Sequence, residues 1–236
     1  PRIAACAQSI SDKGQVNRAS VDRTSYVEAS AESVLARGAI PAVLGGDHSC
    51  PLGLIRTMAR RHPGLGILHI DAHADLRVAY QGFAESHASI MHNVLELDDV
   101  SRLVGVGWRD VCKAEVIRAQ DDSRVVPFWD HQIARARLTG QPFSLIVDSI
   151  VDALPPQVHV SFDIDGLDPS LCPGTGTPVP GGLSFHESAY LLKRVSEART
   201  IVSFDLCEVA PGSDEWDANV GARVLYKLAC AALSSR

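Results

Sequence analysis

The alternation of short apolar runs with amphipathic segments is the feature that most constrains how this chain folds. Seven runs have the length and apolar character of β-strands, at residues 3–6, 39–44, 65–70, 103–106, 125–128, 158–164 and 201–206. Helical patterns lie between or after them, at residues 24–37, 51–61, 89–97, 129–138, 143–153, 185–198 and 218–233. Such an alternation predicts βαβ units and an α/β fold with a mostly parallel sheet. Strands as continuously apolar as residues 158–162 suit a sheet covered on both faces.

The composition narrows the class of protein. A length of 236 residues fits a single domain, and 46% hydrophobic residues suffice for a sizeable core. The net charge of −6 and the lack of a basic run argue against nucleic-acid or anionic-membrane partners. No signal peptide or transmembrane-length apolar stretch is recognisable, and the six cysteines lack CxxC spacing. We therefore expect reduced thiols and a cytoplasmic or organelle-matrix location.

Acidic and imidazole side chains gather where predicted strands end. The segment HIDAHADLR follows an apolar run and places Asp71, His73 and Asp75 at alternate positions, which face the same way on a strand. Three further strand ends supply Asp47 and His48, then Asp163, Asp165 and Asp168, then Asp205 and Glu208. Because sites in parallel α/β sheets form at the carboxyl ends of strands, these groups should meet. Crowded carboxylates repel one another, so we expect a bound cation, and more than one.

The types of ligand indicate which metal is expected. Oxygen-rich sites with one imidazole per ion suit a divalent ion such as Mn²⁺, whereas structural zinc prefers thiolates or several imidazoles. Two divalent ions would balance the four carboxylates of Asp71, Asp75, Asp163 and Asp165. A water between two such ions, roughly 3.5–4 Å apart, becomes acidic enough to act as hydroxide.

Simpler interpretations remain open for several of these residues. Asp168 precedes a proline and suits a turn, and Asp47 suits either a cap for the helix near Pro51 or a group that orients His48. The other histidines have no carboxylate at ligand spacing in the sequence and are interpreted as packing or surface residues: His62, His69, His92, His131, His159 and His186.

Five motifs in order, GGDHS, DAHAD, SFDIDGLDP, GTGTP and EVAP, resemble the ureohydrolase family of arginase, agmatinase and formimidoylglutamase. The resemblance covers the chain from Ala39 to its C-terminus. It implies a three-layer α/β/α sandwich (the arginase-like fold) and assembly into trimers or hexamers. It also implies attack of a manganese-bridging hydroxide on a guanidinium or amidine carbon, with release of urea.

The same resemblance implies roles for individual residues. One ion would be bound by His48, Asp71, Asp75 and Asp163. The second would be bound by Asp71, His73, Asp163 and Asp165, so that Asp71 and Asp163 bridge. Two further residues would act on the substrate: Glu208 would hold the guanidinium, and His87, in FAESHASI, would shuttle protons to the leaving amine.

The substrate is less constrained than the chemistry. Glu85, in the loop 77–87, favours a cationic or neutral substrate tail. Arg77 and Arg109 suit either a substrate carboxylate or a surface ion pair. We expect an agmatinase-like enzyme. The alternatives within the family are a guanidine hydrolase, with nickel in place of manganese, a formimidoylglutamase and an arginase. Outside it they are a deacetylase-like hydrolase with a single zinc and a non-catalytic, metal-stabilised paralogue.

Two features concern the limits of the domain and of the site. Only 44 residues precede Gly45, fewer than in typical family members, so we expect residues 1–236 to form one catalytic domain that lacks part of the usual N-terminal region. Trp216 suits either core packing or a wall of the substrate pocket.

Overall fold

The computed structural model describes residues 13–236 and contains one parallel β-sheet. Its strands, in chain order, are β1 (Ala42–Leu44), β2 (Leu65–Ile70), β3 (Val100–Val106), β4 (Val125–Phe128), β5 (Gln157–Asp163) and β6 (Thr200–Cys207). They are arranged in the order β1-β6-β5-β2-β3-β4, and every neighbouring pair is parallel. The predicted α/β class and parallel sheet are confirmed. The strand predicted at residues 3–6 lies outside the described residues.

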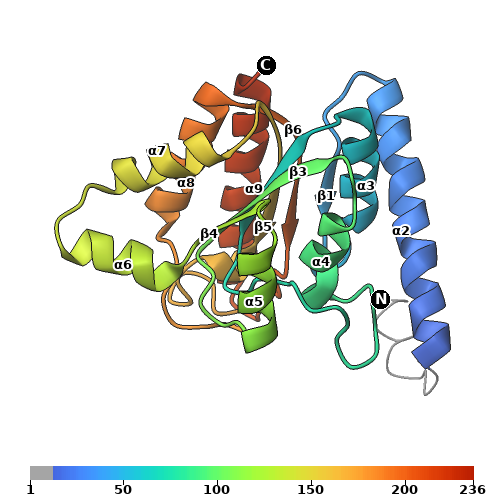
Figure 1. The fold of residues 1–236 in the computed structure, drawn as a ribbon, viewed down its shortest axis with the longest axis horizontal. Helices are drawn as coiled ribbons and strands as arrows, with labels where there is room; N and C mark the ends of the chain where they lie inside the picture. The colour runs from blue at the N-terminus through green and yellow to red at the C-terminus, as the bar shows by residue number, and fades with distance from the viewer. Residues whose placement is uncertain (1–12) are drawn as a thin grey trace.

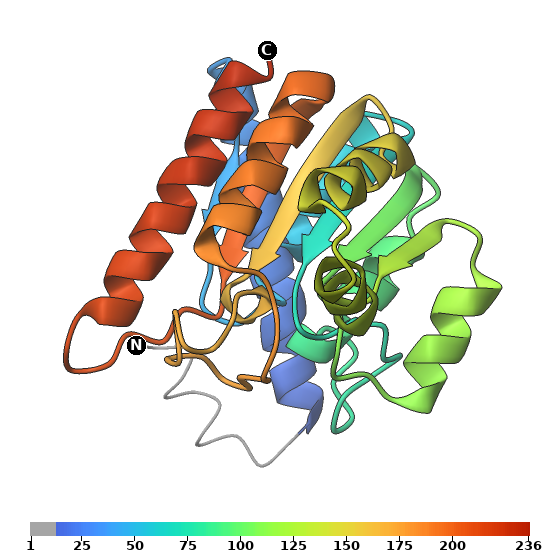
Figure 2. The same cartoon turned by 90° about the vertical axis from the view of Figure 1, so that its left-hand side faces the viewer.

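Helices cover the sheet on both faces, which makes three layers (Figures 1 and 2). One face packs against α2 (Lys13–Ala36), α3 (Leu52–Arg61), α4 (Ile90–Leu95) and α5 (Lys113–Asp121). The other packs against α6 (Asp130–Leu138), α7 (Phe143–Ala153), α8 (Phe185–Ala198) and α9 (Trp216–Ser234). Each face has its own buried apolar core. The central strands β2 and β5 are almost wholly buried, as in a sheet covered on both faces, and the burial includes the polar residues His69, His159 and Ser161.

Besides shifts of up to three residues at other boundaries, three elements differ from the sequence prediction. Helix α5 was not predicted, because only Glu115 and Ala119 on it are buried and its apolar periodicity is therefore weak. Helix α2 begins at Lys13, before the apolar pattern that marked residues 24–37. Strand β1 has three residues where six were predicted, and it lies at an edge of the sheet with Leu44 exposed.

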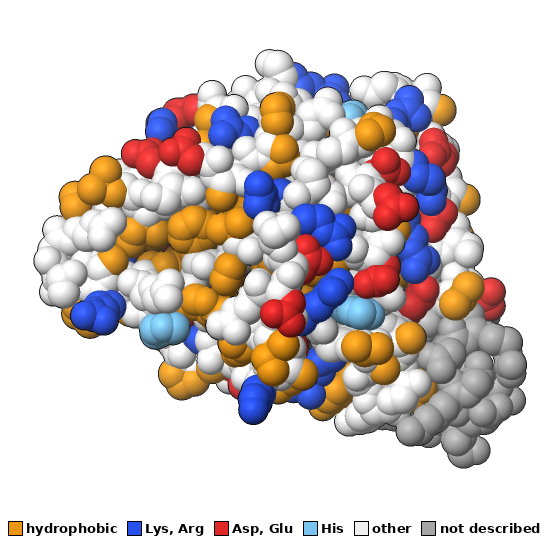
Figure 3. All heavy atoms as spheres, in the orientation of Figure 1, with side chains coloured by type: hydrophobic (Ala, Val, Ile, Leu, Met, Phe, Trp, Pro, Cys, Tyr) orange, Lys and Arg blue, Asp and Glu red, His pale blue; other side chains and the backbone are white. Residues whose placement is uncertain are grey.

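The carboxyl ends of the strands lead into the long loops, which gather at one end of the sheet (Figure 1). Two short 3₁₀ turns lie there, η1 (His87–Ser89) and η2 (Ile164–Gly166). A band of hydrophobic side chains lies in the hollow between α6 and α7 (Figure 3). Leu138, on α6, and Leu145, on α7, are exposed. Within residues 13–236, the helices are all too short or too polar to cross a membrane.

Candidate metal centre

Asp71 is the centre of the predicted site, immediately after β2. Its Oδ1 accepts a hydrogen bond from the backbone N–H of His73 at 2.6 Å, and its Oδ2 lies 2.9 Å from Nε2 of His69. Both oxygens are therefore held in fixed directions. Each faces a different set of ligand-type side chains, which we call the deep group and the outer group.

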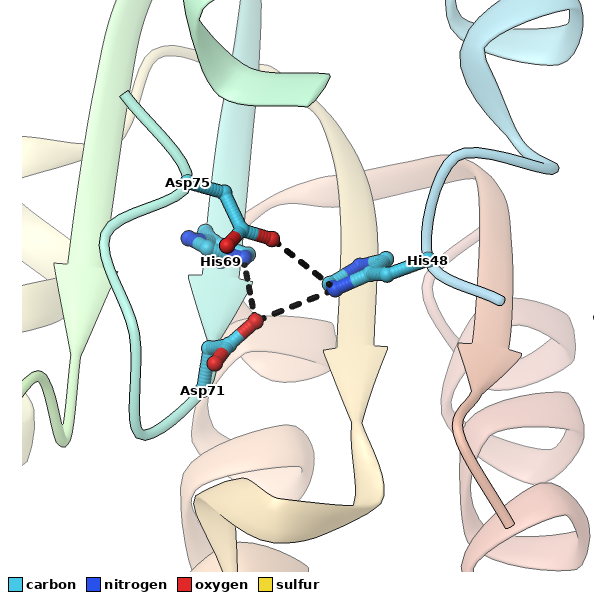
Figure 4. A group of neighbouring side chains, drawn as sticks. All are labelled: His48, His69, Asp71 and Asp75. Atoms are coloured by element: carbon cyan, nitrogen blue, oxygen red, sulfur yellow. Dashed lines mark hydrogen bonds and ion pairs between the residues drawn. The ribbon is translucent and has the colours of Figure 1, made fainter. Parts of the chain in front are cut away.

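The deep group consists of His48, Asp71, Asp75 and Asp163 (Figure 4 shows three of them beside His69). Nδ1 of His48 lies 3.0 Å from Asp71 Oδ2, 3.4 Å from Asp75 Oδ2 and 3.1 Å from Asp163 Oδ2. The four side chains are almost entirely buried. Nδ1 of His48 is also buried, yet it makes no hydrogen bond in the structure. An unpartnered nitrogen surrounded by three carboxylate oxygens is an arrangement that a cation would complete.

The outer group consists of Asp71, His73 and Asp165. Nδ1 of His73 lies 3.4 Å from Asp71 Oδ1 and 3.1 Å from Asp165 Oδ2. Asp165 is oriented by the backbone N–H of Ala72, which donates to its other oxygen at 3.0 Å. The imidazole of His73 is 22% exposed, so this group faces the cavity more openly than the deep group does.

Asp163 belongs by its measured contacts to the deep group. Its Oδ2 faces His48, while its Oδ1 accepts the backbone N–H of Asp165 at 2.9 Å. The two groups share Asp71. The bridging roles expected for Asp71 and for Asp163 both stay predictions.

The electrostatics of the cluster favour a cation. Burial and the neighbouring Asp71 carboxylate raise the pKa values of Asp75, Asp163 and Asp165. Burial opposes charge on His73 as well, but hydrogen bonds to Asp165 and Asp71 outweigh it and raise the pKa of His73 to about 11. Without a metal, the cluster therefore has to retain protons that two divalent cations would displace.

A buried polar network holds His48 from behind. Nε2 of His48 lies 2.9 Å from Ser161 Oγ, which donates to Asp205 Oδ1 at 3.2 Å, and Asp205 Oδ2 lies 2.8 Å from Nε2 of His159. The interpretation of His159 and His69 as residues without a carboxylate neighbour is therefore wrong. For His69 the sequence did carry a signal, because Asp71 follows at a spacing of two. The partner of His159 is Asp205 on another strand, which local spacing does not reveal.

His87 lies on η1 at the wall of the cavity and is paired with Asp47. Nδ1 of His87 lies 3.2 Å from Asp47 Oδ2, and this hydrogen bond raises the pKa of His87. The other oxygen of Asp47 accepts from the backbone N–H of Ser49 at 2.8 Å. The N-cap residue of α3 is Pro51, which makes no side-chain capping bond. Both earlier interpretations of Asp47 are therefore wrong, because it orients His87 and neither caps that helix nor binds His48.

Glu208 follows β6 and is hydrogen-bonded to the segment that follows β1. Its Oε1 accepts the backbone N–H of His48 at 2.8 Å, and burial raises the pKa of its carboxyl group. Glu208 and Asp75 both have left-handed backbone conformations, with φ of 65° and 53°. Such conformations cost on the order of 1–2 kcal/mol per residue outside glycine and cluster at functional sites.

These residues surround a cavity of about 430 Å³ at the carboxyl end of the sheet. Its lining includes His48, His73, Asp75, His87, Asp163, Asp165 and Glu208, together with Asp47, Arg77, Tyr80, Ala88, Asp110, Glu115, Gly176 and Thr177. Asp71 lies beneath these residues and is 1% exposed. The seven lining residues that were predicted to bind metal or substrate therefore come from four separate strand ends and one loop.

Three other expectations about the pocket are corrected. Glu85 does not line it, because Thr24 donates to one of its oxygens at 2.8 Å and Arg56 lies 3.2 Å from the other. Arg109 does not line it either, since its guanidinium donates to backbone carbonyls, including that of Asp165 at 2.7 Å. Trp216 is half exposed outside the cavity, and its Nε1–H donates to the Leu171 carbonyl at 2.8 Å.

Comparison with known proteins agrees with this geometry. The arginase family model matches residues 4–231. N(1)-aminopropylagmatine ureohydrolase of Thermus thermophilus is 36% identical over 183 residues, which cover 78% of this chain and 59% of that protein. Guanidinobutyrase of Pseudomonas aeruginosa is 33% identical over 211 residues, which cover 86% of this chain and 64% of that protein.

A solved structure, the arginase of Bacillus caldovelox, superimposes with a TM-score of 0.78 at 26% identity, covering 90% of this chain and 76% of that one. The chain spans about three-fifths of the length of the aminopropylagmatine ureohydrolase and of the guanidinobutyrase. Since the family model extends over nearly all of its residues, the chain belongs to the arginase family.

Proposed function

We propose that this chain is the catalytic domain of a dinuclear metal hydrolase that acts on small guanidino compounds. The observation that carries the proposal is the position of Asp71, whose two oxygens face two separate sets of ligand-type side chains. A single-ion site would need only one of these sets. The deep group would hold one cation through His48 and three carboxylates, and the outer group would hold the other.

The ligand chemistry supports manganese, with nickel as the alternative. Each group offers one imidazole and several carboxylate oxygens, a donor set that suits borderline divalent ions better than a thiolate-preferring structural zinc. When bound, two such cations supply a water acidic enough to attack the carbon of a guanidinium group.

Glu208 and His87 are proposed to act on the substrate. The Glu208 carboxylate is planar and accepts two hydrogen bonds side by side, which matches the N–H groups of a guanidinium cation. His87 directs Nδ1 to Asp47, so Nε2 is the nitrogen left to transfer a proton to the departing amine. Asp47 keeps the His87 ring oriented and favours its charged form, ready to act as an acid.

The charges at the mouth of the cavity support a cationic substrate tail, as in agmatine. Among residues 13–236, Arg77 is the one arginine in the lining; its Nε lies 3.6 Å from Glu115 Oε2, and its guanidinium carbon lies 5.4 Å from the centre of the Tyr80 ring. Its charge is therefore already balanced. Asp110, by contrast, is 69% exposed at the cavity and 3.8 Å from His73. One relative is named for an aminopropyl derivative of agmatine, with a cationic tail, and another for guanidinobutyrate, with an anionic one.

Urea release from equal concentrations of agmatine, guanidine, guanidinobutyrate, arginine and formimidoylglutamate tests the proposal. We expect agmatine to have the highest kcat/KM. Asp110→Asn should lower kcat/KM for agmatine about five-fold and leave guanidine unaffected, since exposed ion pairs contribute on the order of 1 kcal/mol or less. A preference for guanidinobutyrate or formimidoylglutamate would refute the cationic tail. Elemental analysis that finds one ion per chain, or none, would refute the dinuclear centre.

Assembly into a homotrimer or homohexamer remains a prediction from the family resemblance. Sedimentation of the metal-loaded protein would test it.

A further inference from the structure

A row of residues crosses four strands at one register, directly behind the deep group. Asp205 on β6 is paired with Ser161 on β5, Ser161 with His69 on β2, and His69 with Gly105 on β3. The indole of Trp108 occupies the space where residue 105 has no side chain. A Cβ atom at position 105 would lie only 2.2 Å from two ring carbons of Trp108. The glycine therefore allows the indole to lie beside His69.

Trp108 determines which nitrogen of His69 carries the proton. Nε1 of Trp108 lies 3.1 Å from Nδ1 of His69, and both side chains are fully buried. An indole N–H can only donate, so Nδ1 of His69 has to be the accepting, unprotonated nitrogen. The proton then resides on Nε2, which lies 2.9 Å from Asp71 Oδ2 and donates to it. The direction of both hydrogen bonds follows from the chemistry of the indole alone.

This arrangement also decides the role of His69. By distance alone, His69 could be grouped with His48, Asp71 and Asp75 as a metal ligand. A ligating imidazole needs a bare nitrogen facing the metal. The bare nitrogen of His69 faces Trp108, and its protonated nitrogen faces a carboxylate. His69 is therefore a donor to a ligand.

We propose that Trp108 is a positioning residue for the metal centre, acting through His69 to hold Asp71 Oδ2 toward His48. Asp71 Oδ1 is already held by the N–H of His73, so the donor on Oδ2 fixes the remaining rotation of the carboxylate. A carboxylate locked in this way presents one oxygen to each group of ligands. The inference rests on the proposed function, because it assigns a purpose to the centre's shared ligand.

The first experiment measures metal affinity directly. Mn²⁺ binding to metal-free protein would be titrated by calorimetry for wild type, Trp108→Phe, His69→Phe and His69→Gln. Loss of partners behind metal ligands typically weakens binding about 10–100-fold, so we expect at least a ten-fold loss for Trp108→Phe and more for His69→Phe. His69→Gln retains both a donor and an acceptor and should lose less than His69→Phe.

Trp216→Phe is the matched control, because it removes an indole N–H hydrogen bond whose acceptor, the Leu171 carbonyl, does not line the cavity. It should bind manganese like wild type. Thermal unfolding of the metal-free variants shows whether each is folded before binding is compared. If folded Trp108→Phe and His69→Phe bind both ions as tightly as wild type does, the positioning role is refuted and the dinuclear centre stands. If wild type itself binds no pair of ions, the proposed function fails instead.

A second measurement does not depend on metal. Nitrogen-15 NMR of the imidazole side chains in metal-free wild type, with His69→Gln to assign the signal, reports which nitrogen of His69 is protonated. We expect a proton on Nε2 and none on Nδ1, with this preference reduced in Trp108→Phe and unchanged in Trp216→Phe. A proton on Nδ1 in wild type would overturn the inference, even if Trp108→Phe were too unstable to titrate.

Discussion

The deep and outer groups share Asp71 and are built from the same residue types, yet they lie in different surroundings. In the deep group, His48 is 1% exposed and is braced from behind by Ser161 and Asp205. In the outer group, His73 is 22% exposed and its far nitrogen faces exposed Asp110 at 3.8 Å. One set of ligands is held by a buried network and the other borders the cavity.

The difference implies that the deep and outer groups would release a bound cation at different rates. A cation in the deep group would be enclosed by fully desolvated ligands whose orientation is fixed, so it should leave slowly. A cation in the outer group would have solvent on one side and fewer supporting contacts. We therefore expect the outer ion to exchange first, and the predictions below test that asymmetry.

Replacement of the shared ligand should have the largest effect. Asp71→Ala removes an oxygen from both groups, so we expect loss of both ions and of nearly all hydrolysis, beyond the 10–100-fold typical of supporting residues. Elemental analysis and urea release measure the two effects. Asp168→Ala is the matched control, since Asp168 accepts the backbone N–H of Ser170 at 2.8 Å and is not among the residues that line the cavity. An Asp71→Ala protein that retained both ions would remove the basis for treating the groups as one centre.

Replacement of His48 and His73 one at a time should remove one ion and leave the other bound. His48→Ala should weaken mainly the deep ion, and His73→Ala should leave a protein with one tightly held ion. Timed removal of manganese from wild type by a chelator should be biphasic, and His73→Ala should lack the fast phase. If His48→Ala is the variant that lacks the fast phase, the order of exchange is the reverse of what burial suggests.

Loss of the proposed proton donor should impair catalysis while leaving both halves occupied. His87→Ala should lower kcat by about 10²–10⁴-fold with two ions bound, the range typical for general acid–base groups. Asp47→Asn should have a smaller effect of the same kind, because it removes only the partner of His87 Nδ1. Steady-state kinetics and metal content measure this. An empty metal site in His87→Ala would make His87 a ligand.

The smallest expected effect is on the pH dependence of stability. Burial and Asp71 raise the pKa values of Asp75 and Asp163 in the metal-free fold. A group whose pKa is raised by folding stabilises the protein below its unfolded pKa, and this contribution is lost as the pH rises through its folded pKa. The contribution of Asp75 and Asp163 to the free energy of unfolding of the metal-free protein should therefore fall as the pH rises.

Manganese binding displaces the protons that these groups retain, so the metal binds more tightly as the pH rises. The Tm difference between loaded and metal-free protein should therefore widen between about pH 5 and pH 8. Calorimetric scans of both forms measure it. In Asp75→Asn the widening should be reduced, because one of the groups with a raised pKa is gone. A Tm difference that is constant over this range would indicate that the deep group is not held together by a cation.

Much of the site could be predicted from the sequence, because its signals are local. The spacing of two in HIDAHAD and in VHVSFDID, directly after apolar runs, places Asp71, His73 and Asp163 at strand ends. Partners supplied by other elements could not be predicted this way. Asp47 contacts His87 across 40 positions of sequence, and Glu85 is bound by Thr24 and Arg56 from two helices.

The sequence by itself determined the parallel α/β architecture, the acidic and imidazole residues of the candidate centre and the end of the sheet at which they meet, since hydrophobic periodicity and strand ends depend on neighbouring residues. Only the tertiary structure decided how the ligands are held. Trp108 reaches His69 because β2 and β3 are adjacent and Gly105 leaves room for an indole. The left-handed backbone at Asp75 and Glu208 is likewise sustained by surrounding contacts, because local preference disfavours it in both residues.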